Sequence, residues 1–389
     1  MTLDNVKILV TGANGFLGTR LVEYLALTYR ADVRALVRDL RRSIRVCRLP
    51  VEIVLGDVRD ERAVGRAVDG CSIVVHCASA VDAGLKPRAS STFLGTKIVA
   101  RMALQQKVQR FVHISSAAVY GSPGEVEVTE DFPLRPRWKN DVYAAAKIAG
   151  EQLVLNYFLQ GLRAVIIQPT MIYGPYSGEW SIHPLKILRT ADYALPQSGL
   201  LGPVYVDDVV RAIILAATKK GVEGQRYIIS GSETVEWTKF YQSYARMHAK
   251  GQVLAITNDE YSCLAKQRRS QTSFAELARL IARHPEIRRA AGKNPFLRWS
   301  YNLSKRFRLQ KRLQFRAKYS IGASGSTFRL GEAEKPAAFL PGAVLWKLYK
   351  GRSRYSIEKA KRELGYHPQI ELERGMELTA QWARWARLI

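Results

Sequence analysis

Short apolar runs rich in valine and isoleucine alternate with stretches of helical periodicity over the first part of the chain. Parallel strands that are buried on both faces appear as continuous apolar runs. This pattern predicts strands at residues 6–11, 32–37, 52–55, 73–76, 110–114, 164–168 and 225–230. Strands that alternate with helical segments predict an α/β fold, with a doubly wound parallel sheet covered by helices on both faces.

The regular alternation ends near residue 250, and the chain then becomes basic and helix-prone. A helix predicted at residues 356–364 is stopped by Gly365 and Pro368. We therefore expect three parts. A large domain spans residues 1–175 with a contribution from 204–232, a smaller substrate-binding lobe combines 176–262 with 351–389, and a basic helical insert occupies 263–350.

The composition is that of a globular protein, with 47% hydrophobic and 24% charged residues among 389. The 4 cysteines form no C-x-x-C pair, which favours a reducing cytoplasmic setting. The first residues lack a basic stretch before an apolar core, so we expect neither a secretory signal nor a membrane span. His113 and His183 have no neighbouring ligand set, and we expect no metal site.

The net charge of +26 is concentrated in residues 263–320, which carry 16 basic and two acidic side chains. In residues 294–316, Phe296, Trp299, Leu303 and Phe307 recur at helical spacing among lysines and arginines. Such a helix suits an anionic membrane surface, and we expect peripheral membrane association as one role of the insert. The alternative is that the aromatic stripe packs on the protein itself. No nucleic-acid-binding module accompanies the charge, so we expect no nucleic-acid partner.

The first predicted strand ends in a glycine-rich turn, Thr11-Gly12-Ala13-Asn14-Gly15-Phe16-Leu17-Gly18, that leads into a helix. Gly12 can make the tight turn, Gly15 lets the backbone approach a pyrophosphate, and Gly18 permits close packing of helix on strand. The amino end of a helix attracts anions. The turn therefore predicts a dinucleotide site.

With its other motifs, this turn resembles the extended short-chain dehydrogenase/reductase family, of the epimerase/dehydratase type. The resemblance spans about residues 1–245 and 355–385, and it rests on the segments Gly56-Asp57-Val58, Val75-His76-Cys77-Ala78, Ser115-Ser116-Ala117-Ala118-Val119-Tyr120-Gly121, Tyr143-Ala144-Ala145-Ala146-Lys147, Gln168-Pro169 and Tyr205-Val206-Asp207-Asp208. It implies a Rossmann domain whose cofactor-binding residues are Gly12, Gly15, Phe16, Leu17, Gly18, Arg38, Asp57, Val58, Ala78, Tyr143, Lys147 and Pro169. It also implies a small-molecule substrate, and a homodimer is one arrangement that we expect.

The resemblance assigns catalysis to Ser116, Tyr143 and Lys147. Residues four apart on a helix share a face, so Tyr143 and Lys147 can meet at one ligand. We expect Lys147 to lower the pKa of Tyr143 from about 10 to about 7, which requires roughly 4 kcal/mol, and to hold the nicotinamide ribose. Ser116 would hydrogen-bond the substrate oxygen while Tyr143 transfers its proton. Ser116 is preferred to Ser115 because it lies three residues before Val119, as in the family.

Two kinds of residue that the family uses for particular reactions are missing at the corresponding positions of this chain, and their absence restricts the class of reaction that we expect. Members of the family that dehydrate sugar nucleotides carry acids directly after the catalytic hydroxyl residue, where this chain has Ala117 and Ala118. Sugar-nucleotide epimerases usually place an arginine shortly before Tyr205, and residues 198–204 contain none. The leading expectation is an epimerase or oxidoreductase that moves a hydride at a sugar, with a nucleotide-activated sugar of polysaccharide biosynthesis as substrate. The alternatives are a 3β-hydroxysteroid-dehydrogenase-like ketone reductase with an apolar substrate, and a non-catalytic dinucleotide sensor.

Cofactor choice depends on the end of the second strand. NAD enzymes place an acid there on the ribose hydroxyls, whereas NADP enzymes place an arginine near the 2′-phosphate. The acid position is Val37, and Arg38 follows it with Arg41 and Arg42 nearby, which favours NADP. NAD stays open, because Asp39 would supply the acid after a shift of one or two residues.

Overall fold

The computed structural model describes residues 3–79, 91–138, 141–247, 251–271, 325–328 and 338–389. The predicted membrane-surface segment, residues 294–316, lies outside these described residues. Within them, no helix is long and apolar enough to cross a membrane.

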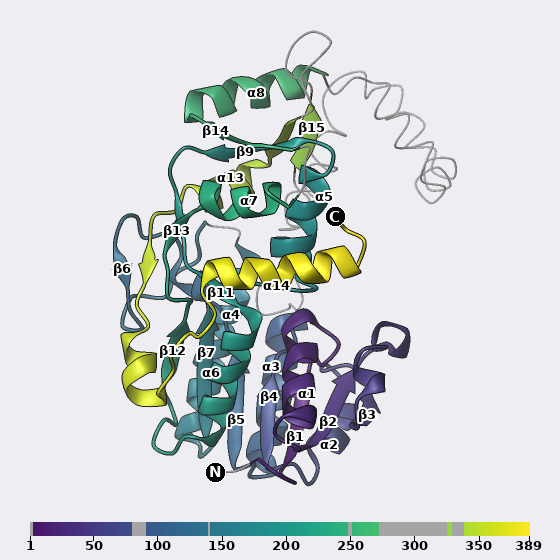
Figure 1. The fold of residues 1–389 in the computed structure, drawn as a ribbon. Coiled ribbons are helices and arrows are strands. Elements are labelled where there is room, and N and C mark those ends of the chain that lie inside the picture. Colours follow the sequence, from purple (N-terminus) through teal and green to yellow (C-terminus); the bar gives the residue numbers. More distant parts are fainter. Residues whose placement is uncertain (1–2, 80–90, 139–140, 248–250, 272–324, 329–337) are drawn as a thin grey trace, which may run out of the picture.

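A seven-stranded parallel sheet forms the lower half of the molecule (Figure 1). Its order is β12-β7-β5-β4-β1-β2-β3, and the chain reverses direction across the sheet after β3. Its strands are β1 Lys7–Thr11, β2 Asp32–Val37, β3 Glu52–Leu55, β4 Ile73–His76, β5 Arg110–Ile114, β7 Ala164–Pro169 and β12 Arg226–Ile229. The predicted strands and the doubly wound parallel sheet are confirmed, because each predicted apolar run forms one of these strands.

Helices cover both faces of this sheet. On one face α1 (Phe16–Leu27) and α6 (Val206–Thr218) bury Leu21, Leu25 and Ile213 in a common core. On the other face α2 (Glu61–Val68), α3 (Ser91–Gln105) and α4 (Val142–Leu159) bury Val64, Val99 and other apolar side chains. The two cores keep the central strands away from water, as their continuous apolar sequences require.

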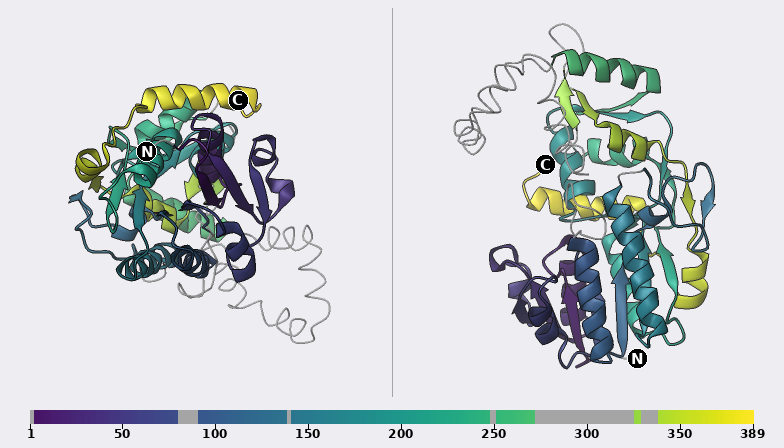
Figure 2. Two further views of the ribbon diagram at one scale, coloured as in Figure 1. Left: turned by 90° about the horizontal axis from the view of Figure 1, so that it is seen from below. Right: turned by 180° about the vertical axis from the view of Figure 1, so that it is seen from behind.

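A smaller lobe lies above the carboxyl ends of these strands (Figure 1). Its sheet has the order β14-β9-β16-β15. The strands are β9 Asp192–Pro196, β14 Val253–Ile256, β15 Gly325–Phe328 and β16 Ala338–Pro341, and the helices around them are η5 Gly178–Ile182, α5 His183–Leu188, α7 Trp237–Ala245, α8 Asn258–Gln271 and α13 Ala343–Tyr349. Its core is aromatic, with the Tyr349 hydroxyl hydrogen-bonded to those of Tyr193 and Tyr241 at 3.0 and 2.6 Å. The last helix, α14 (Leu372–Trp385), lies across the molecule between the lobe and the parallel sheet (Figures 1 and 2).

Short elements connect the two parts. Paired strands β8 (Met171–Tyr173) with β11 (Pro203–Tyr205), β10 (Leu200–Leu201) with β13 (Val235–Glu236), and β6 (Glu127–Val128) with β17 (Arg354–Tyr355) bring distant segments together. The remaining turns of helix are η1 Leu40–Arg42, η2 Val46–Arg48, η4 Ala117–Tyr120 and η6 Ala360–Leu364. Gly365 ends η6 with φ 75°, in agreement with the predicted stop.

The lobe includes residues that were expected to belong to the insert. Residues 338–350 were assigned to the insert, but β16 pairs with β9 in the lobe's sheet. In α13, Leu345, Trp346 and Tyr349 are buried in the lobe. The expected boundary at residue 350 therefore does not match this packing.

Candidate active site

The glycine-rich turn between β1 and α1 leaves a cradle at the amino end of the helix. Gly12 has φ +66°, and a Cβ there would come within 2.7 Å of the Ala78 backbone nitrogen. A Cβ at Gly18 would collide with the Gly12 carbonyl oxygen. The first turn of α1, which begins with Phe16 and Leu17, contains no acid. The turn and the free helix terminus fit the pyrophosphate of a dinucleotide.

Arg38 directly follows β2. Its side chain is 62% exposed, and its Nη1 lies 3.9 Å from Oδ2 of Asp57. Asp57 is also bound to Arg59, whose Nη2 is 2.9 Å from the same oxygen. Asp39 is engaged elsewhere, because its carboxylate caps η1 by accepting the Arg41 backbone N–H at 3.0 Å. The structure thus brings Arg38 and Asp57 together.

Val58, next to Asp57, packs against α3. A Cβ added to Gly95 on that helix would approach the Val58 Cγ2 atom to 2.6 Å. Ala78, at the other expected position, closes over Gly12. Val58 and Ala78 therefore pack closely on Gly95 and Gly12, respectively.

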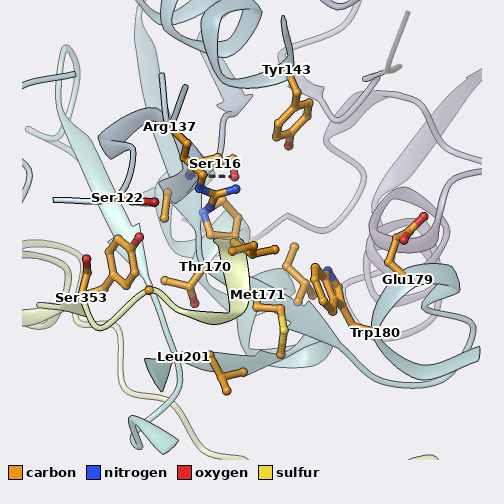
Figure 3. Close-up of a pocket in the computed structure, with 18 of the residues that line it drawn as sticks. Ser116, Ser122, Arg137, Tyr143, Thr170, Met171, Glu179, Trp180, Leu201 and Ser353 are labelled. Atoms are coloured by element: carbon orange, nitrogen blue, oxygen red, sulfur yellow. Dashed lines mark hydrogen bonds between the residues drawn. The ribbon is translucent and has the colours of Figure 1, made fainter. Parts of the chain in front are cut away.

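Ser116 and Tyr143 face one another beyond the carboxyl end of strand β5 (Figure 3). Ser116 follows β5 and caps η4, where its Oγ accepts the Ala118 backbone N–H at 3.2 Å. Tyr143 lies in the first turn of α4, which Asp141 caps by accepting the Ala144 N–H at 3.0 Å. Burial raises the pKa of Tyr143, and a hydrogen bond with Ser116 opposes this rise.

Lys147 lies one turn further along α4 and is 3% exposed. Its Nζ donates to the Ile114 carbonyl oxygen at 2.7 Å and is 5.9 Å from the centroid of the Tyr143 ring. Burial lowers the pKa of Lys147 to about 8. The prediction that Lys147 brings the Tyr143 pKa to about 7 is wrong for this structure, because burial is the larger effect and raises that pKa.

Behind Lys147 lies a buried polar network that the sequence analysis missed. Glu151 is fully buried. Its carboxylate accepts a hydrogen bond from the Ser115 hydroxyl, and its two oxygens lie 2.9 and 3.0 Å from the Gln168 side-chain amide nitrogen, which donates to them. The Tyr120 hydroxyl donates to the Gln168 carbonyl oxygen at 2.6 Å. Glu151 follows Lys147 by four residues, so its place on the same helix face was available from spacing alone. Ser115 is thus committed to Glu151, whereas Ser116 faces Tyr143.

The histidines of the sheet are buried. The Nδ1 atom of His76 is 2.8 Å from the Thr11 hydroxyl, and burial lowers the pKa of His76 to about 3. Neither ring nitrogen of His113 has a hydrogen-bond partner in the structure. Over the part of the chain that the structure describes, there is no cluster of three or more histidine, cysteine or acidic residues suited to a metal ion.

A cavity of about 590 Å³ opens beside Ser116 and Tyr143 (Figure 3). Its wall is mostly apolar and aromatic, and it includes Phe16, Ala117, Ala118, Pro169, Met171, Ile172, Trp180, Leu200, Leu201, Trp237, Leu348 and Tyr355. Among the described residues that line it, only Arg137 and Glu179 carry a formal charge. Leu200 and Leu201 belong to the segment before Tyr205 in which the sequence analysis found no arginine. The cavity can hold an apolar body with its reacting oxygen near Ser116.

Sequence comparisons identify related proteins. The sequence model of the NAD-dependent epimerase/dehydratase family matches residues 8–230. A sterol demethylase protein B of Methylococcus capsulatus is 31% identical over 57% of this chain and 69% of its own length. A dTDP-glucose 4,6-dehydratase of Streptomyces niveus is 32% identical over 58% of this chain and 73% of its own length. A decarboxylating sterol-4-alpha-carboxylate 3-dehydrogenase of Candida albicans is 26% identical and covers 97% of both chains.

Solved structures share the fold. A dTDP-glucose 4,6-dehydratase from Bacillus anthracis in complex with NAD superposes with a TM-score of 0.66 at 17% identity, covering 99% of this chain and 100% of the other. At this identity the similarity supports the arrangement of the parallel sheet and the lobe.

Proposed function

Because the chain belongs to the NAD-dependent epimerase/dehydratase family, of the extended short-chain dehydrogenase/reductase type, we propose that it transfers a hydride between a nicotinamide dinucleotide and a secondary alcohol or ketone on an apolar substrate. The main support is the cavity wall, which Ala117 and Ala118 line directly after Ser116 in the chain and to which Leu200 and Leu201 add further apolar surface. An apolar wall excludes water and binds hydrocarbon through the area that it buries. An apolar substrate is also supported by two relatives whose names refer to sterols, the sterol demethylase protein B and the sterol-4-alpha-carboxylate 3-dehydrogenase.

The dinucleotide would lie along the carboxyl ends of β1, β2 and β4. Gly12, Gly15 and Gly18 leave room for its pyrophosphate, and Phe16, Leu17, Ala78 and Pro169 would line its path to the cavity. When bound, the nicotinamide supplies or accepts the hydride. Lys147 would hold the nicotinamide ribose with its ammonium group.

Ser116 and Tyr143 would handle the substrate oxygen. Ser116 donates a hydrogen bond that orients this oxygen, and Tyr143 gives its proton to it during reduction or takes a proton during oxidation. Because burial raises the Tyr143 pKa, the phenol is protonated at neutral pH, so the group is prepared to act as the acid. Lys147, with a pKa of about 8, is mostly cationic at neutral pH and stabilises negative charge that develops on the phenol oxygen.

A nucleotide-activated sugar of polysaccharide biosynthesis is the second candidate substrate. It is supported by the relative named as a dTDP-glucose 4,6-dehydratase, and by the hydroxyl groups of Ser122, Thr170 and Ser353 on the cavity lining. Against dehydration in particular, Ala117 and Ala118 provide no proton donor beside Ser116. A hydride-shuttling epimerase or a reductase of a sugar would remain compatible with these residues.

For the cofactor we propose NADP in preference to NAD. Arg38 has a mostly exposed guanidinium at the end of β2, where a 2′-phosphate would lie, and Asp39 is committed to the turn at η1. We further propose, from the sequence alone, a cytoplasmic protein that reaches anionic membranes through residues 294–316, with a homodimer as one arrangement.

A spectrophotometric assay tests the substrate class. The purified full chain is mixed with NADPH or NADH and either 5α-cholestan-3-one or a 4-keto nucleotide sugar, and absorbance of the reduced cofactor is followed. We expect oxidation of the cofactor with the steroid ketone, faster with NADPH. Turnover of the nucleotide sugar alone, or interconversion of UDP-glucose and UDP-galactose without net cofactor oxidation, would establish the second candidate instead.

A further inference from the structure

Arg137 is the one cation among the described residues that line a mostly apolar cavity wall. It lies on the loop before α4 and is half-buried, and Figure 3 shows it on the same wall as Ser116 and Ser122. Within the described part of the chain, no ion pair links its guanidinium to a carboxylate. The other charged lining residue, Glu179, projects from η5 on the opposite side of the cavity (Figure 3).

The Arg137 side chain is held in place by its surroundings. It lies close enough to Tyr355, whose strand β17 pairs with β6, to oppose the rise that burial causes in the pKa of that phenol. It is also close enough to Tyr143 for its charge to oppose the rise in the pKa of that phenol. A guanidinium on the cavity wall that has no carboxylate partner among the described residues is available to an anionic group of a ligand.

We propose that Arg137 binds an anionic group of the substrate, next to the carbon that exchanges the hydride. This inference rests on the proposed function and narrows it, because it makes the substrate an amphipathic acid rather than a neutral hydrocarbon alcohol or ketone. The anion is a carboxylate or a phosphate, both of which match the planar guanidinium through two parallel hydrogen bonds. Arg137 is then a specificity-determining residue that positions the substrate oxygen between Ser116 and Tyr143.

The position of Arg137 sets where the anion lies on the substrate. Ser116, Tyr143 and Arg137 lie toward one end of the cavity in Figure 3, whereas Trp180 lies away from them and packs on Trp237, with ring centroids 5.5 Å apart. A substrate whose oxygen contacts Ser116 therefore places its anion within a few bonds of that oxygen and its hydrocarbon against the tryptophans. An acid group at the distal end of a long apolar body would not reach Arg137.

Binding to the full chain tests this inference without turnover. Trp180 and Trp237 line the cavity, so their fluorescence reports its occupation. The probes are decanoate and decan-1-ol, which share a chain length and differ in charge. We expect decanoate to bind the wild type at least about tenfold more tightly than decanol, since a charge-assisted bond is lost with the alcohol. Arg137→Gln should abolish this preference and change the decanol affinity less than about twofold.

Two variants control for charge and for folding. Arg135→Gln removes an equal charge from the same loop, but Arg135 does not line the cavity and its guanidinium lies 5.9 Å from the Phe132 ring. It should retain the decanoate preference, and Arg137→Lys should retain only part of it because an ammonium cannot form the two parallel bonds. Each variant must also keep the unfolding temperature of the wild type. An equal loss of decanoate affinity in Arg135→Gln and Arg137→Gln, or no loss in either, overturns the inference.

A parallel titration with UDP distinguishes the two sources of the anion. If UDP binds in an Arg137-dependent manner and decanoate does not, Arg137 is an anion site for a nucleotide phosphate, and the apolar substrate of the proposed function is wrong. If neither probe depends on Arg137, the inference fails, and the proposed function still stands or falls by the steroid ketone assay.

Discussion

Replacing Lys147 by methionine should separate what this residue does for activity from what it costs in stability. The side chain is 3% exposed, and its ammonium donates a hydrogen bond to the Ile114 carbonyl oxygen at 2.7 Å. Methionine has nearly the same length and no charge. Lys147→Met should therefore remove the buried charge while leaving the packing of α4 nearly unchanged.

The pKa of the amine gives the magnitude. Burial lowers this pKa from its ordinary value of 10.5 to about 8. At about 1.4 kcal/mol per unit, keeping the amine charged in the fold costs about 3 kcal/mol below the folded pKa. Between pH 8 and 10.5 the unfolded chain holds a proton that the folded chain has released, so the free energy of unfolding rises with pH. The wild type should gain about 3 kcal/mol relative to Lys147→Met across this window.

Urea unfolding followed by circular dichroism measures this difference at several pH values between about 7 and about 10. Near neutral pH the two proteins should differ little, because the relief of the buried charge is offset by about 1–3 kcal/mol for leaving the Ile114 carbonyl without its donor. Other titrating groups act on both proteins and largely cancel in the difference. A difference that stays constant over the whole pH range would refute the reasoning, since the amine would then be neutral or hydrated in the fold.

Three further predictions concern the cofactor and the substrate oxygen. Tyr143→Phe removes the proton-transferring hydroxyl but keeps the ring, so turnover should fall at least about a hundredfold, while cofactor affinity measured by fluorescence titration stays the same. Arg38→Ala should weaken NADPH binding by about tenfold or more, because a charge-assisted contact is lost, and an equal loss of NADH binding in the same titration would contradict the assignment. Gly12→Ala should lower both the unfolding temperature and cofactor affinity, because its φ is +66° and its Cβ would lie 2.7 Å from the Ala78 nitrogen, whereas Gly70→Ala, with φ +69° and open space around it, should affect only stability and by about 1–2 kcal/mol.

The parallel sheet was predictable because its signals are local. Each central strand is buried on both faces, so its sequence is a short apolar run that can be recognised without knowing its neighbours. The extent of the lobe was not predictable in this way. β16 enters the lobe's sheet by pairing Ala338 with Asp192, and no periodicity within either segment encodes a contact between positions so far apart in the chain.

In the candidate site, too, some residues belong to local sequence motifs and others are brought together only by the tertiary fold. Ser116, Tyr143 and Lys147 belong to short motifs, and the structure brings Ser116 and Tyr143 to one end of the cavity. The rest of the wall, including Arg137, Trp180 and Tyr355, comes from several separate segments whose meeting depends on the tertiary fold. The reacting groups are therefore recognisable from local sequence, whereas the apolar surroundings that bear on the choice of substrate are not.

Those surroundings also explain why the predicted effect of Lys147 on Tyr143 was wrong. Sequence spacing gives the distance between a lysine and a tyrosine on one helix face, but the interaction energy depends on how much water remains around them. In this fold, burial acts on both groups and favours the neutral form of each, raising the pKa of Tyr143 and lowering that of Lys147. A phenol that keeps its proton beside an amine that is mostly cationic at neutral pH suits the reduction of a ketone, in which the phenol must give up that proton as the hydride arrives.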